Sequence, residues 1–126
     1  MNTVFLIQSM YERNHNKSWW ELSRDEREAY YNKNITRAMM NHYKEVGIVS
    51  MQIICSANQK TKFETQKYRV EHFSKYLRNN GYKCITFPYS NRNIADTTFC
   101  VEIPYEKFEG FKRVLSYYEM TEYKFV

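Results

Sequence analysis

The sequence predicts an α+β fold, with a mixed sheet of about four strands, helices packed on one face and one extra inserted helix. Two observations lead to this class. Short apolar runs typical of strands recur along the chain, and segments with apolar residues at helical spacing separate them. Aromatic residues make up 17% of the sequence, which speaks against a disordered chain. With 126 residues, we expect a single domain spanning 1–126.

Residues 3–10 are predicted to form the first strand. Apolar side chains fill both faces of this segment from Val4 to Ile7, as in a strand buried at the centre of a sheet. The polar residues 11–18 would then connect it to a helix.

The next segment, 23–46, carries the strongest helix pattern in the chain. Ser23 and Glu26 match a capping box, and Gly47 supplies a stop after the last turn. Residues at helical spacing form one face, namely Tyr31, Ile35, Ala38, Met39, His42 and Val46. Its other face is polar and basic.

A second strand is predicted at 48–55, where Val49, Met51 and Ile53 alternate with more polar residues. Together with the strand at 3–10 and the helix between them, it would form a right-handed unit with parallel strands. A further helix at 65–80 follows, ended by Gly81.

The last third predicts two strands, a helix and an edge strand. The segments are a strand at 82–87, an exposed loop at 89–97, a strand at 98–103, a helix at 104–118 and an edge strand at 123–126. The resulting order is close to the ferredoxin-like βαββαβ plan, with the helix at 65–80 inserted between its second and third strands.

The start of the long helix resembles that of a known group of proteins. The residues that carry the resemblance are Lys17, Trp19, Trp20, Leu22, Ser23, Glu26, Arg27, Tyr30 and Tyr31. Following an apolar segment, they resemble small dimeric α+β barrel proteins related to the chlorite-dismutase-like group, and 99–118 resembles their last strand and helix in order. The resemblance implies a sheet curved around a cleft and a homodimer formed through sheet contacts. No functional residue carries over.

Positive charge is concentrated in the middle of the chain. Residues 60–95 contain eight Lys or Arg and two acidic residues, so this segment alone carries +6. Such a field attracts nucleic acid or an acidic protein surface. The alternative is a solvated face that reflects only an AT-rich genome. The candidate binding residues are Lys60, Lys62, Lys67, Arg69, Lys75, Arg78, Lys83 and Arg92, with Arg37 and Lys44 of the long helix possible additions.

Several kinds of chemistry lack the residues they need. The chain has three glycines and no glycine-rich phosphate loop, which excludes a P-loop or Rossmann site. The three histidines lack the spacing of a zinc site, and His42 is best explained as a core histidine. We therefore expect no cofactor, no metal ion and no catalytic residue set.

Cys55, Cys84 and Cys100 form an odd number with no paired spacing, and each falls in a predicted strand. We expect reduced, largely buried thiols and a cytoplasmic protein, without a targeting or membrane-spanning segment.

Three classes of function remain. The first hypothesis is a non-enzymatic binding or inhibitory module that uses its basic region on nucleic acid, a nucleoprotein or an acidic protein. A small Lys-, Asn- and Tyr-rich chain also fits a product of a virus or mobile element. A protein-interaction or assembly module is the second class. The alternative is an enzyme or small-molecule binder with a barrel cleft.

Overall fold

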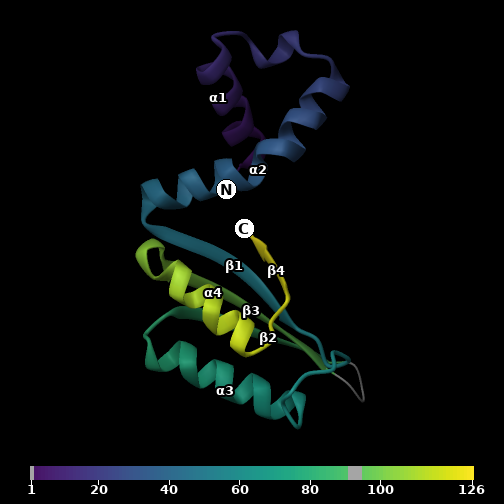
Figure 1. Cartoon of the computed structure of the whole chain (residues 1–126), viewed down its shortest axis with the longest axis vertical. Helices are drawn as coiled ribbons and strands as arrows, with labels where there is room; N and C mark the ends of the chain where they lie inside the picture. Colours follow the sequence, from purple (N-terminus) through teal and green to yellow (C-terminus); the bar gives the residue numbers. More distant parts are fainter. Residues whose placement is uncertain (1, 91–94) are drawn as a thin grey trace. The chain divides into compact units, whose positions relative to one another are not determined.

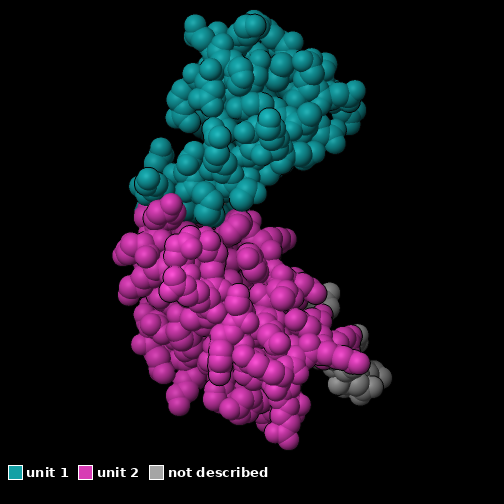
Figure 2. Space-filling model, viewed as in Figure 1, with its two compact units in different colours: residues 1–46 teal, residues 47–126 magenta. Residues whose placement is uncertain are grey.

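The computed structural model describes residues 2–90 and 95–126. The chain divides into two compact units, residues 1–46 and residues 47–126 (Figure 2). Within the described residues there are four α-helices and one four-stranded antiparallel sheet, which confirms the α+β class (Figure 1). Each unit is described by itself below, and the single domain spanning 1–126 stays a prediction.

The first element is a helix, α1 (Thr3–His15), so the predicted strand at 3–10 is wrong. The side chain of Asn2 caps it by accepting a hydrogen bond from the N–H of Phe5 at 3.0 Å. Ile7, Met10 and Tyr11 are the buried residues of this helix. These three residues have the i, i+3, i+4 spacing of one helix face. Burial of that face favours a helix over the strand that the apolar run from Val4 to Ile7 predicted.

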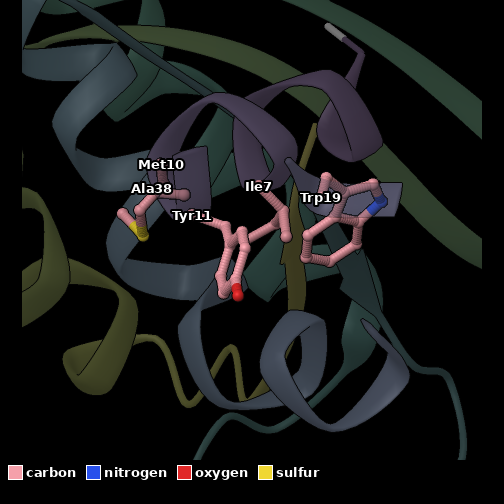
Figure 3. Close-up of a cluster of buried hydrophobic side chains, with 5 residues drawn as sticks. All are labelled: Ile7, Met10, Tyr11, Trp19 and Ala38. Atoms are coloured by element: carbon pink, nitrogen blue, oxygen red, sulfur yellow. The ribbon is translucent and has the colours of Figure 1, made fainter. Parts of the chain in front are cut away.

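The core of the first unit lies between α1, the short 3₁₀ helix η1 (Trp19–Glu21) and α2 (Arg24–Val46). Figure 3 shows its buried side chains, Ile7, Met10, Tyr11, Trp19 and Ala38. The carboxylate of Glu12 accepts a hydrogen bond from the N–H of Trp19 at 2.9 Å, which fixes the connection between α1 and η1.

The predicted start of the long helix is confirmed. The N–H of Glu26 donates to Ser23 Oγ at 3.2 Å, and the N–H of Ser23 donates to Glu26 Oε1 at 3.0 Å. This is the reciprocal pair of a capping box. Gly47, with φ of +79°, follows the last turn in the left-handed conformation that glycine adopts without strain.

The second unit is built on a sheet with strand order β2-β3-β1-β4. The strands are β1 (Ile48–Cys55), β2 (Lys83–Ser90), β3 (Ala95–Pro104) and β4 (Glu122–Phe125). Every neighbouring pair is antiparallel, so the predicted mixed sheet and its parallel strand pair are wrong. The reason is the helical α1, which removes the strand that the parallel pair required.

Helix α3 (Gln66–Asn79) lies between the strands at 48–55 and 83–90, as predicted, but these are the first and second strands of the sheet, so its role as an extra inserted helix is not confirmed. β2 ends at Ser90 and β3 begins at Ala95, so residues 89–90 and 95–97 of the loop predicted at 89–97 are strand, and the rest of that loop lies outside the described residues. The last helix begins as a 3₁₀ turn, η2 (Tyr105–Lys107), before α4 (Phe108–Tyr117).

Helices α3 and α4 cover one face of the sheet. The ring of Phe73 from α3 lies with its centroid 5.0 Å from Phe99 of β3 and 6.2 Å from Phe111 of α4. Val49, Met51 and Ile53 of β1 are buried on this face. The opposite face presents the alternate residues, which are partly buried or exposed.

Candidate polyanion-binding surface

The structure separates the ten predicted binding residues. Five are exposed on one connection and one helix of the second unit: Lys60, Lys62, Lys67, Lys75 and Arg78. We call these five residues the basic surface. Of the other five, Arg69 is in the interior, Lys83 is on the sheet, Arg37 and Lys44 are on α2 of the first unit, and Arg92 is outside the described residues.

Arg69 is buried, so its assignment to an exposed basic surface is wrong. Its side chain is 1% exposed, although it lies on α3 between exposed neighbours. Its position corresponds to the inner side of the helix, four residues before Phe73. Counting charges along the sequence could not distinguish this side from the outer one.

The guanidinium group of Arg69 finds hydrogen-bond acceptors instead of an ion pair. Nη1 donates to the carbonyl oxygens of Tyr118 at 3.3 Å and Glu119 at 3.1 Å, and to Gln59 Oε1 at 3.3 Å. Nη2 donates to the carbonyl oxygen of Ser56 at 3.1 Å. One side chain thus joins α3, the connection 56–65 and the segment that follows α4.

Further contacts hold the same connection in place. Gln59 Nε2 donates to the carbonyl oxygen of Glu119 at 3.0 Å, and the N–H of Lys62 donates to the Glu119 carboxylate at 2.8 Å. Gln66 Nε2 donates to the carbonyl oxygen of Cys55 at 3.0 Å. Lys60 and Lys62 therefore belong to a connection that is fixed by side chains and by the buried Arg69.

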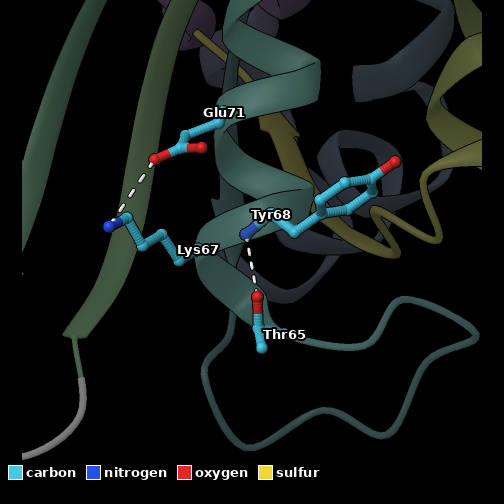
Figure 4. A network of polar contacts seen from close by, with 4 residues as sticks. All are labelled: Thr65, Lys67, Tyr68 and Glu71. Atoms are coloured by element: carbon cyan, nitrogen blue, oxygen red, sulfur yellow. Dashed lines mark hydrogen bonds and ion pairs between the residues drawn. The ribbon is translucent and has the colours of Figure 1, made fainter.

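Helix α3 begins at a Thr65 cap, whose hydroxyl accepts a hydrogen bond from the N–H of Tyr68 at 3.0 Å. Figure 4 shows the exposed pair of Lys67 and Glu71, 4.0 Å apart, on one side of α3 and the Tyr68 ring on the other. Within residues 2–90 and 95–126, the remaining four cations of the basic surface make no ion pair. Glu64 and Glu71 are the exposed carboxylates between 60 and 78, so the basic surface with both of them carries +3.

Lys83 does not belong to the basic surface. It lies on β2, and its ammonium group is 3.6 Å from the carboxylate of Glu102, the residue opposite it on β3. Both side chains lie on the sheet face that α3 and α4 leave open. Its charge is therefore matched by a cross-strand partner.

Aromatic side chains lie next to the basic surface, and sequence analysis did not single them out. Phe63 stacks on Tyr118 with centroids 5.6 Å apart, and lies 6.1 Å from Tyr117 and 6.3 Å from Tyr68. Tyr68 and His72 lie 4.0 Å apart, centroid to centroid. The i, i+4 spacing of Tyr68 and His72 was the available signal, but it could not reveal that α4 ends beside them.

The sheet face opposite the helices contains a hollow of about 290 Å³, lined among others by Gln52, Ile85, Cys100 and Val126. In the first unit, His42 is partly buried and lines a smaller hollow of about 160 Å³ between α1 and α2, together with Arg13 and Glu45.

All three cysteines are free thiols, and only Cys55 is fully buried. Burial raises the pKa of the Cys55 thiol and that of the Cys84 thiol. A raised pKa lowers the thiolate fraction at neutral pH, which makes both residues weak nucleophiles.

Searches for related proteins found no match to any family model, curated protein or solved structure. No helix in the described part of the chain has the length and apolar character needed to cross a membrane. Residues 2–90 and 95–126 also contain no group of three His, Cys, Asp or Glu side chains arranged to hold a metal ion.

Proposed function

We propose that this protein is a non-enzymatic binding module whose basic surface engages a polyanionic partner. Nucleic acid, a nucleoprotein and an acidic protein surface share the chemistry that this surface recognises. One observation carries the proposal: five exposed cations lie on one connection and one helix, and the charged groups of four of them make no ion pair among the described residues. Unpaired cations that stay hydrated are available to phosphates or carboxylates.

The hydrogen bonds that hold the backbone carrying Lys60 and Lys62 favour a binding surface over a merely solvated face. Arg69 joins the connection 56–65 to α3 and to the segment after α4 through four hydrogen bonds. The backbone that carries Lys60 and Lys62 is thereby ordered before any partner arrives. Preorganisation of this kind reduces the entropy that binding would otherwise cost.

We also propose that residues 47–126 follow the ferredoxin-like plan. The order β1-α3-β2-β3-α4-β4, with strand order β2-β3-β1-β4, supports this assignment. In such an arrangement the helices present a surface away from the sheet, and the basic surface includes the outer side of α3.

The proposal is tested by charge reversal. Lys67→Glu, Lys75→Glu and Arg78→Glu are combined in one variant, and binding to fluorescein-labelled oligonucleotides and to labelled polyglutamate is measured at low and moderate salt. We expect the wild type to bind at least one of these polyanions with strong salt dependence, and the variant to lose most of that binding.

A matched variant separates the basic surface from net charge. Lys107→Glu, Arg113→Glu and Lys124→Glu reverse three exposed cations of the same unit that lie outside the basic surface. We expect this control to bind more tightly than the first variant. Equal losses would mean that only net charge matters, and no binding of any polyanion by the wild type would refute the proposal.

A second candidate is a small-molecule site in a dimeric α+β barrel. The hollow of about 290 Å³ on the open sheet face favours it, because a sheet face without covering helices is where a barrel encloses its cleft. This candidate requires a homodimer. Sedimentation of the wild type as a monomer at high concentration would argue against it.

A further inference from the structure

Five aromatic residues gather where the connection 56–65, the start of α3 and the end of α4 meet. They are Phe63, Tyr68, His72, Tyr117 and Tyr118, and we call them the aromatic platform. Each ring lies within 6.3 Å, centroid to centroid, of at least one other ring in the group. Burial raises the pKa of the Tyr118 hydroxyl, and the nearby hydroxyls of Tyr117 and Tyr68 act in the same direction.

The platform is partly open to solvent. Tyr68 is 48% exposed and Tyr117 is 59% exposed, and the His72 side chain is exposed as well. Single exposed aromatic residues are common on protein surfaces and need no explanation. Here the exposed rings of Tyr68 and Tyr117 each lie within 6.3 Å of the partly buried Phe63 ring, centroid to centroid, and such a cluster of partly open aromatic side chains is typical of an interaction site.

Cations of the basic surface flank the platform at both ends. The ammonium group of Lys62 lies 3.9 Å from the centroid of Tyr117 and 5.4 Å from that of Phe63. Lys75 follows Tyr68 and His72 at i+7 and i+3, so these three residues share one side of α3. Lys67, Glu71 and Arg78 lie further around α3 from Tyr68 and His72, where Glu71 and Arg78 line a groove against β2; both also neighbour Lys75, at i−4 and i+3.

We infer that the aromatic platform binds single-stranded nucleic acid, with bases stacked on Tyr68 and Tyr117 and backbone phosphates paired with Lys62 and Lys75. This inference rests on the proposed function, because it names the polyanion that the basic surface receives. It also divides that surface, since Lys62 and Lys75 flank the rings and Lys67 and Arg78 do not.

The chemistry of the two parts favours this partner over the other polyanions. An acidic peptide would pair with the cations but leave the ring faces exposed. Duplex DNA offers phosphates, but its base faces are stacked inside the helix. An unpaired strand alone supplies phosphates and free aromatic faces in alternation, which is why single-strand binding sites combine a positive groove with aromatic side chains.

Tyr117 can take part although Lys62 lies close to its ring. A lysine side chain is flexible, and its ammonium group binds a phosphate as readily as an aromatic face. The Tyr117 residue as a whole is 59% exposed with Lys62 in its present position. A base can therefore stack on the exposed part while Lys62 turns toward the adjoining phosphate.

The test compares an oligothymidylate with an abasic oligomer of the same length, because both carry the same phosphates and only one carries bases. We expect the wild type to bind the oligothymidylate at least tenfold more tightly, since stacking contributes about that factor for each base. Tyr68→Leu and Tyr117→Leu should each reduce this preference about tenfold, and Tyr68→Phe should retain it.

Two matched controls isolate the platform. Tyr123→Leu removes a tyrosine of similar exposure on β4, outside the platform, and should leave the preference unchanged. Lys75→Ala should weaken binding of the oligothymidylate more than Lys67→Ala does. Thermal unfolding of each variant identifies any that has lost its fold. If a Tyr→Leu variant does not fold, the inference is tested by Tyr68→Phe and by the comparison of Lys75→Ala with Lys67→Ala.

The outcomes for this inference and for the proposed function are distinct. Equal affinity of the wild type for both oligomers overturns the inference and leaves the proposed function standing. Preference for polyglutamate over every oligonucleotide also overturns the inference, in favour of an acidic protein partner. Absence of binding to all three polyanions overturns both.

Discussion

The inner and outer sides of α3 carry the same kind of charge and put it to different uses. On the inner side, the guanidinium group of Arg69 is buried and donates hydrogen bonds to three carbonyl oxygens and one side-chain amide. On the outer side, Lys67, Lys75 and Arg78 are exposed. The inner cation stabilises the fold, and the outer ones remain available to a partner.

The difference between the two sides shows what fixes the role of a cation. Arg69 has enough acceptors around it to replace the water that it gives up, which makes burial of a charge tolerable. Lys75 and Arg78 are exposed to solvent and have no such acceptors among residues 2–90 and 95–126. To assign the role of a cation on a helix, one must therefore know which side of the helix it occupies, and not only its charge.

The largest expected effect comes from removing the inner cation. Arg69→Met keeps similar volume but removes the donor of the Tyr118 carbonyl oxygen, whereas the carbonyl oxygens of Ser56 and Glu119 each keep a hydrogen bond from Gln59. A buried group without a hydrogen bond costs about 1–3 kcal/mol, so we expect the free energy of unfolding to fall by about 1–3 kcal/mol. Urea denaturation followed by circular dichroism measures the change.

The matched control for this variant is Lys75→Met on the outer side of the same helix. We expect the free energy of unfolding to change by less than about 0.5 kcal/mol, as for most surface substitutions. Similar effects of the two variants would contradict the distinction between the two sides of α3.

The inner side should also respond to alkaline pH. Burial raises the pKa of Tyr76 on α3 to about 12 from an ordinary value of 10.0, with Tyr82 nearby contributing in the same direction. The unfolded chain then releases this proton first, so stability from Tyr76 is complete below pH 10 and is lost as the pH rises toward 12. Between pH 9 and pH 11, the free energy of unfolding should decrease less for Tyr76→Phe than for the wild type. An identical decrease in the two proteins would exclude Tyr76 as the source of the pH dependence.

A smaller effect is expected at the start of α3. Thr65→Ala removes the hydroxyl that accepts from the N–H of Tyr68, and helix caps of this type contribute about 1 kcal/mol. Thr65→Ser keeps the oxygen and should retain most of the stability. If both variants matched the wild type in the denaturation midpoint, the start of α3 would not depend on this cap.

The sequence predicted most elements of the second unit because their patterns are local. Alternation at 48–55, the apolar residues of α3 and the stop at Gly81 are each readable within a few residues. The error at 3–10 arose because four consecutive apolar residues fit both a buried strand and a helix. In the folded unit, the helical face of this segment packs against Trp19 and Ala38, and these contacts are not visible in the sequence.

The candidate site was predicted less completely than the fold. The exposed cations of α3 were predicted from the concentration of positive charge in residues 60–95. The burial of Arg69 could not be predicted in this way, because it depends on acceptors as far along the chain as Tyr118 and Glu119. The pairing of Lys83 with Glu102 depends on strand register in the same way. The aromatic platform joins residue 63 to residue 118, and no spacing rule connects segments that far apart.

The central claim, that exposed cations outside the core form the binding surface, is tested most directly by salt dependence. The affinity for an oligothymidylate is measured over a range of salt concentrations for the wild type and for Lys75→Ala, and its logarithm is plotted against the logarithm of salt concentration. The account predicts a steep negative slope for the wild type, reduced in magnitude by about one when Lys75 is removed. A slope that is the same for both proteins would contradict it.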